Sequence, residues 1–156
     1  DRSVSRGLGD VYKRQGMDFT TVVSQVSRYI NEMETYFVLE TLDNLRKNGR
    51  LTRVQSLVTS TLHIKLLMGA TPEGEICKKG QAMSIKQALS KMVSLMAADP
   101  KHEGRRLSIV HCNCLERAFH VKELVMKQCR FGEILISDTG GISTVYANDG
   151  GIVVAY

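Results

Sequence analysis

The fold is decided by the stretch YFVLETLDNLRKNGR, residues 36–50. It begins with the aromatic and β-branched residues 36–38, which favour a strand. It continues with Leu39, Leu42 and Leu45, which share one face of a predicted helix. Asn48-Gly49 predicts the end of that helix, because glycine accepts the left-handed conformation that closes many helices. A strand that leads into an amphipathic helix is typical of a domain in which helices pack on a sheet.

The same alternation continues on both sides of this stretch. The apolar spacing predicts further helices over residues 19–33, 52–62 and 85–96, and one that opens at Asn113 or Cys114 and runs to residue 125. Strands are expected over residues 64–68, 76–77, 107–110, 131–136 and 151–155, with turns at residues 72–75 and 138–141. The order α, β, α, α, β, β, α, β, α, β, β predicts an α/β (α+β) fold, a mixed sheet with helices packed on it.

Composition limits the class of protein. The chain has 156 residues, of which 43% are hydrophobic and 24% charged, so it is one domain or part of a larger protein. We find no apolar window long enough for a membrane span and no signal peptide after Met17. The four cysteines have no Cys-x-x-Cys spacing. These features predict a cytoplasmic protein with reduced thiols and without a membrane span.

The first fifteen residues differ from the rest of the chain. Residues 5–15 resemble the in-frame translation of a sequencing adapter, so we interpret residues 1–15 as a non-native leader. The net charge of +5 would favour a nucleic-acid partner. Once the leader's four basic and two acidic side chains are set aside, 17 basic residues face 14 acidic ones. We therefore expect no nucleic-acid partner. Because the leader is interpreted as non-native, we also expect that an N-terminal domain precedes residue 16.

The sequence contains one cluster of side chains that could bind a metal. His111-Cys112-Asn113-Cys114 would need a third ligand from elsewhere in the chain. The same residues are typical of a strand that ends at a helix cap, with Cys112 as a small apolar residue in the core, and we favour this interpretation. Since glycine-rich phosphate loops and the Gly-x-Ser-x-Gly motif are also absent from the sequence, we predict no metal, no cofactor and no catalytic residue.

Two glycine-containing segments could bind an anion. In residues 48–53, free amides at the start of a helix and the Arg50 guanidinium suit a carboxylate, although Gly49 could be only a helix cap. In residues 146–151, the Tyr146 hydroxyl and backbone amides could face a ligand, or the segment could be only a turn before a strand. Residue types alone favour the second alternative in each case.

The residues from 36 to 156 resemble the C-terminal half of the DegV family. The family's Gly-Arg-Ile-Ser/Thr motif is similar to Gly49-Arg50-Leu51-Thr52, and its Ile-Lys-Pro strand and Asp-Gly turn are similar to residues 64–66 and 73–74. Residues 19–33 resemble the helix that precedes this half. The resemblance implies a two-domain protein, in which residues 16–35 lead from the N-terminal domain and residues 36–156 form the C-terminal domain.

The resemblance also implies a function. Family members bind a fatty acid and include the acyl-carrying subunit of bacterial fatty acid kinases. It therefore implies a protein that is not an enzyme, which binds a long-chain fatty acid and presents the carboxylate to a partner kinase. By position, the carboxylate site would consist of Arg50, Tyr146, Gly49, Thr52 and Gly150.

The chain departs from the family pattern at two positions. Tyr146 stands where the family has the histidine of its His-x-Gly-Pro-Gly signature, and Met83 stands near a family arginine linked with docking on the kinase. Two alternatives remain. The first is an α/β transferase for a small anionic substrate, with Arg50 as binder, Tyr146 as acid and Asp149 as base. The second is a regulatory domain without a ligand.

Overall fold

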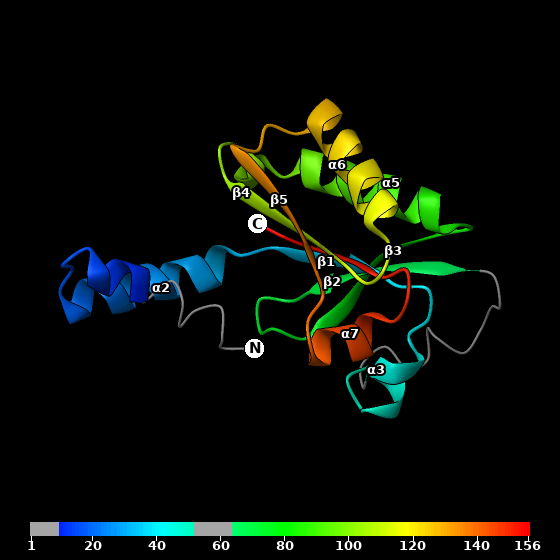
Figure 1. Ribbon diagram of the computed structural model, residues 1–156, viewed down its shortest axis with the longest axis horizontal. Helices are drawn as coiled ribbons and strands as arrows, with labels where there is room; N and C mark the ends of the chain where they lie inside the picture. Colours follow the sequence, from blue (N-terminus) through cyan, green and yellow to red (C-terminus); the bar gives the residue numbers. More distant parts are fainter. Residues whose placement is uncertain (1–9, 52–63) are drawn as a thin grey trace. The chain divides into compact units, whose positions relative to one another are not determined.

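The computed structural model describes residues 10–51 and 64–156 (Figure 1). The helix expected over residues 52–62 and the proposed site residue Thr52 lie outside the described residues. The chain divides into two compact units, Asp1–Met33 and Glu34–Tyr156. Each unit is described by itself. In the described residues, no helix has the length and apolar content needed to cross a membrane.

The first unit contains the helix α2, Phe19–Glu32. The Asp18 side chain caps its start, because one carboxylate oxygen accepts a hydrogen bond from the Thr21 amide (3.1 Å) and the other from the Thr21 hydroxyl (2.6 Å). The predicted helix over residues 19–33 is thus confirmed to within one residue. Residues 10–14 are also helical, although their sequence shows no helical period.

The second unit is built on one mixed sheet. Its strands are β1 (Thr35–Val38), β2 (Lys65–Ala70), β3 (Ile76–Ala82), β4 (Arg106–His111), β5 (Glu133–Asp138) and β6 (Ile152–Ala155). Its helices are α3 (Asp43–Lys47), α5 (Ile85–Ala98), the short 3-10 helix η1 (Pro100–His102), α6 (Leu115–Gln128) and α7 (Ile142–Ala147). In the described residues the strand order is β3-β2-β1-β6-β4-β5, with β4 and β5 parallel and all other neighbours antiparallel. The predicted mixed sheet with packed helices is confirmed.

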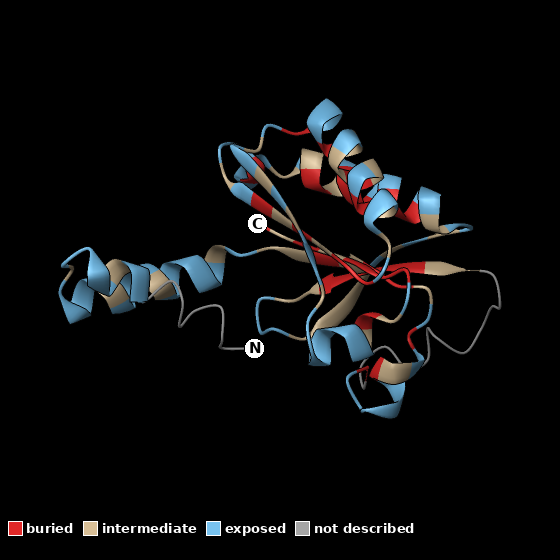
Figure 2. Cartoon of the chain, viewed as in Figure 1, coloured by how far each residue is buried: buried red, intermediate tan, exposed pale blue. Residues whose placement is uncertain are grey.

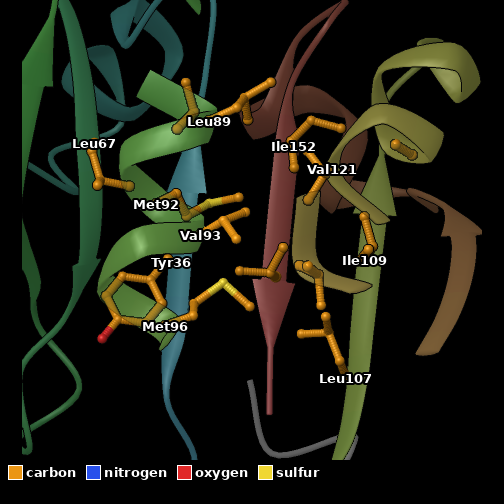
Figure 3. Close-up of a cluster of buried hydrophobic side chains, with 14 of the residues drawn as sticks. Tyr36, Leu67, Leu89, Met92, Val93, Met96, Leu107, Ile109, Val121 and Ile152 are labelled. Atoms are coloured by element: carbon orange, nitrogen blue, oxygen red, sulfur yellow. The ribbon is translucent and has the colours of Figure 1, made fainter. Parts of the chain in front are cut away.

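The main core lies between one face of the sheet and the helices α5 and α6 (Figures 1 and 3). Strand residues alternate between the two faces, so that Tyr36 and Val38 are buried against these helices, whereas Phe37 points to the other face. Met92 and Val93 of α5 are fully buried against the strands. Figure 2 shows buried residues along the central strands and on the sides of α5 and α6 that face them.

A second, smaller core lies on the opposite face, beneath α3 and α7 (Figure 1). Its buried members are Leu39, Leu42, Leu45, Leu51, Leu66, Met68, Cys112 and Ala147. The partly buried Phe37 and Tyr146 pack against it. The helices α3 and α7, which cover this face in the described residues, are short, at five and six residues. This face is where the site forms.

The structure corrects two of the predicted elements. The leucine stripe predicted a helix from Leu39, but α3 begins only at Asp43, because Glu40 is held by ion pairs and the Thr41 hydroxyl accepts a hydrogen bond from the Asp43 amide. Leu39 and Leu42 are buried outside the helix.

The second correction concerns α7. The sequence pattern predicts no helix over residues 142–147. They form a helix whose Ala147 packs into the smaller core. Tyr146 and Ala147 belong to this helix, so the turn predicted over residues 146–151 is confined to Asp149 and Gly150.

Candidate functional site

The connections that build the site meet at one edge of the sheet. The strand pairings mean that β1, β3, β4 and β5 run in one direction, while β2 and β6 run in the other. The carboxyl ends of β1, β3, β4 and β5 lead into α3, α5, α6 and α7, respectively. In open α/β sheets, ligands bind outside the carboxyl ends of the strands. This edge is therefore the expected place for a site.

A cavity of about 280 Å³ lies beneath α3 and α7, on the face of the smaller core. It is lined by Phe37, Leu39, Leu45, Arg50, Ile76, Ser143, Tyr146, Ala147 and Val153. Phe37 and Val153 are paired directly across β1 and β6, so their side chains share one face of the sheet. Among the described residues that line this cavity, Arg50 alone is charged. The lining residues carry one guanidinium and two hydroxyls, and the walls are mostly hydrocarbon.

The turn after α3 determines where Arg50 lies. The Gly49 amide donates to the Arg46 carbonyl (3.1 Å), and the Arg50 amide donates to the Leu45 carbonyl (2.8 Å). With Gly49 at φ +67°, this is the Schellman arrangement that ends many helices. Leu51, which follows, is only 1% exposed. The interpretation of Gly49 as a helix cap is therefore confirmed, and Arg50 lines the cavity. The anion site stays a prediction, since the helix expected to supply its free amides lies outside the described residues.

Replacing Gly49 with alanine is expected to destabilise the protein by roughly 1 to 2 kcal/mol, the cost of a left-handed backbone with a Cβ atom. A Cβ atom at this position would meet no other atom within 4 Å, so the expected cost is conformational alone. Urea unfolding measures the loss. Gly140→Ala is the matched control, because it also meets open space and its φ is not positive. Equal stabilities for the two variants would contradict the assignment of Gly49 as the cap.

The other predicted site residues are only partly brought together. Tyr146, on α7, lines the same cavity as Arg50. Gly150 does not line it: its carbonyl accepts a hydrogen bond from the Arg117 guanidinium, and its amide donates to the Cys112 carbonyl (2.9 Å). Asp149, the base of the transferase alternative, does not line the cavity either, and it accepts a hydrogen bond from the Asn113 side chain (2.8 Å). The three side chains of that alternative do not converge on this cavity.

A network of ion pairs joins the end of β1 to α6 and β2. The Glu40 carboxylate lies 2.9 Å from Arg117 Nη2 and 2.7 Å from Lys65 Nζ. Partial burial alone would raise the pKa of Glu40, but the hydrogen bonds from Lys65 and Arg117 outweigh it and hold the pKa below its usual value. Because Arg117 also bonds the Gly150 carbonyl, this network fixes the loop between α7 and β6.

The lowered pKa of Glu40 predicts a pH dependence of stability. A carboxylate with a depressed folded-state pKa stabilises the fold above its ordinary pKa, here 4.5, and this contribution is lost as the pH falls below it. We therefore expect Glu40→Gln to lose stability at pH 7 and to show a smaller further loss than the wild type as the pH falls through this range. Unfolding midpoints from pH 7 to pH 3 measure the difference. The exposed Glu116→Gln is the control, and parallel pH curves for Glu40→Gln and the wild type would contradict the account.

The histidine and cysteine cluster lies where β4 ends and α6 begins. His111 is buried, and its Nδ1 atom accepts a hydrogen bond from the Cys114 amide (3.4 Å). The same Nδ1 atom lies 3.5 Å from an Asp138 carboxylate oxygen. Cys112 is buried, and burial raises the pKa of the Cys114 thiol. Residues 10–51 and 64–156 contain no group of three or more side chains arranged to hold a metal ion.

Most of the apolar lining was missed by sequence reasoning. Phe37 and Val153 show only as strand residues, and their pairing appears only when β1 and β6 lie side by side. Ser143 was missed together with α7. Its spacing of three from Tyr146 was the available signal for a shared helix face.

Comparison with known proteins places this arrangement in a family. The family model described as "Uncharacterised protein, DegV family" matches residues 11–156. A DegV domain-containing protein of Streptococcus pyogenes is 28% identical over 141 residues, which cover 90% of this chain and 50% of that relative. The chain thus spans about half the length of the curated relatives it matches.

Solved structures agree. A DegV family protein of Ruminococcus gnavus, refined with vaccenic acid, is 48% identical with a TM-score of 0.89, over 97% of this chain and 54% of that one. The Streptococcus pneumoniae Fatty Acid Kinase (Fak) B3 protein, loaded with linoleic acid, shares the fold at 24% identity with a TM-score of 0.81, over 98% of this chain and 54% of that one. On sequence and fold together, the chain belongs to the DegV family.

Proposed function

We propose that this chain binds a long-chain fatty acid, with the carboxylate at Arg50 and Tyr146 and the tail along the apolar lining of the cavity. The observation that carries the proposal is the composition of the lining, which combines one guanidinium with hydrocarbon side chains. A guanidinium forms strong, charge-assisted hydrogen bonds with a carboxylate, and a tyrosine hydroxyl donates one more. Gly49 contributes by holding the turn that carries Arg50.

The energetics suit an acyl chain. Burial of a methylene group contributes about 0.8 kcal/mol, so an apolar wall supplies affinity and the polar groups set the orientation. The volume of about 280 Å³ lies just below the range of ligand pockets, which is about 300 to 1,000 Å³. We therefore expect this cavity to hold the head group and the first part of the tail. The vaccenic acid of the Ruminococcus gnavus relative supports this ligand class.

The proposal includes a partner. Arg50 is exposed as well as lining the cavity, so a carboxylate bound to it would be accessible to a second protein. We propose that a fatty acid kinase subunit acts on this carboxylate in the cytoplasm, while the chain itself binds and presents the ligand without catalysing a reaction. The name of the Streptococcus pneumoniae relative is consistent with such a partner.

Mass spectrometry of lipids extracted from the purified chain tests the binding proposal. We expect long-chain fatty acids in the extract, and a rise in melting temperature when a fatty acid is added to the stripped protein, because a ligand that binds only the folded state stabilises it. A fatty alcohol of equal length is the matched ligand, and we expect it to give a smaller rise. An empty extract together with an unchanged melting temperature would contradict the proposal.

A further inference from the structure

The side-chain amide of Asn44 links the end of α7, which carries Tyr146, to α3, which leads into the turn with Arg50. Asn44, on α3, does not line the cavity. Its side-chain Nδ2 donates to the Val145 carbonyl (2.6 Å) and to the Asn148 side-chain oxygen (2.7 Å), both at the end of α7. We infer that Asn44 is a positioning residue, which fixes the positions of Arg50 and Tyr146 relative to each other. The inference rests on the proposed function and deepens it, because it identifies what sets the geometry of the carboxylate site.

On the α3 side, the path from Asn44 to Arg50 is short and hydrogen-bonded. The Asn44 carbonyl accepts from the Asn48 amide (3.1 Å) and from its side chain (2.8 Å). The carbonyl of Leu45, the residue after Asn44, accepts a hydrogen bond from the Arg50 amide. A displacement of Asn44 would therefore move the whole turn that carries the guanidinium.

On the α7 side, the two acceptors of Asn44 bracket Tyr146. Val145 precedes the tyrosine directly, and Asn148 follows it by two residues. The Asn148 side chain is itself oriented, because its nitrogen donates to the Tyr146 carbonyl (3.4 Å). The Asn148 amide also donates to the Thr144 carbonyl (3.1 Å). Asn44 thus binds the backbone just before Tyr146, and it binds the Asn148 side chain just after it.

The helix α7 has few apolar contacts that would hold it in place without this link. Ala147 is its one buried residue. Ile142 and Val145 are 75% and 55% exposed. The loop that follows is anchored separately at Gly150, through Arg117. We therefore expect the amide of Asn44 to make a large contribution to where Tyr146 lies relative to Arg50.

The chemistry of position 44 is specific. Two N–H donors meet two oxygen acceptors, an arrangement that only the amide end of the side chain satisfies. Aspartate has the same shape but would place a carboxylate against both oxygens. Alanine would remove the donors and leave the Val145 carbonyl and the Asn148 oxygen without this partner.

Affinity measurements on Asn44→Ala and Asn44→Asp test the inference, with a long-chain fatty acid and a fatty alcohol of equal length. We expect Asn44→Ala to reduce the affinity for the fatty acid by roughly 3- to 10-fold, the range for one lost hydrogen-bonding group. The affinity for the alcohol should fall by less than about 2-fold. Asn44→Asp should reduce the affinity for the fatty acid at least as much. In an Arg50→Ala background, Asn44→Ala should cause little further loss, because coupled residues are not additive.

The control is Asp149→Ala. Asp149 lies on the loop between α7 and β6, and this variant removes the hydrogen bond that Asp149 accepts from Asn113. It removes neither acceptor of Asn44. It should leave the acid affinity unchanged. If Asn44→Ala lost affinity for the acid and the alcohol equally, Asn44 would support the cavity as a whole, and the inference would be overturned. Unchanged affinity for the acid would overturn it as well.

If the wild type binds neither ligand, the proposed function fails, and NMR of the Tyr146 ring then decides the inference. The ring resonances should move in Asn44→Ala and stay in place in Asp149→Ala. Unmoved resonances in Asn44→Ala would overturn the inference.

Discussion

Replacing Arg50 with alanine is expected to weaken the binding of a long-chain fatty acid by roughly 10- to 100-fold. This range corresponds to the loss of a hydrogen-bonding group of about 1.5 to 3 kcal/mol that engages a charge. The affinity for a fatty alcohol should change much less, because its hydroxyl carries no charge. Isothermal titration or a fluorescence displacement assay with both ligands measures the difference.

Arg46→Ala is the matched control for this prediction. Arg46 lies on α3, just before the turn that carries Arg50. It is exposed, pairs with Asp43 at 3.2 Å and does not line the cavity. Surface pairs of this kind contribute little to stability, so this variant should bind like the wild type. Equal affinities for Arg50→Ala and Arg46→Ala would remove Arg50 from the site.

Replacing Met92 with alanine is expected to destabilise the second unit by roughly 2 to 5 kcal/mol, the cost of a large-to-small change in a packed core. Met92 is fully buried between α5 and the strands, beside Val93 (Figure 3). A loss of this size is a large fraction of the total stability of a domain, about 5 to 15 kcal/mol. Chemical denaturation measures the change.

Met126→Ala serves as its control, since Met126 lies on α6 and is 66% exposed. Its unfolding free energy should change by less than about 0.5 kcal/mol, as for most surface substitutions. A Met92→Ala variant as stable as Met126→Ala would mean that α5 does not pack on the sheet as described.

The elements with a clear period could be predicted from the sequence. The helix α5 follows from an apolar stripe between Ser84 and Asp99-Pro100, and the structure confirms its cap, since the Ser84 hydroxyl accepts from the Gln87 amide (3.3 Å). The hairpin of β2 and β3 follows from two apolar runs around residues 72–75. These signals are local, so they survive without knowledge of the tertiary fold.

The helices that form the site could not be predicted in the same way. The start of α3 depends on Glu40, whose partners Lys65 and Arg117 are 25 and 77 residues away in the chain. The helix α7 packs through Ala147 and is bonded by Asn44, 101 residues before Val145. Residue types pointed to Arg50 and Tyr146 as candidates, but only the fold brings them to one cavity. Non-local contacts decide this part of the structure, and one sequence does not reveal them.

A crystal structure of the chain with a brominated long-chain fatty acid would test the central claim most directly, because the bromine locates the tail by anomalous scattering. The account predicts the carboxylate within hydrogen-bonding distance of the Arg50 guanidinium and the Tyr146 hydroxyl, with the first part of the tail against Phe37 and Val153. A carboxylate bound elsewhere, with the Arg50 side chain directed into solvent, would contradict it.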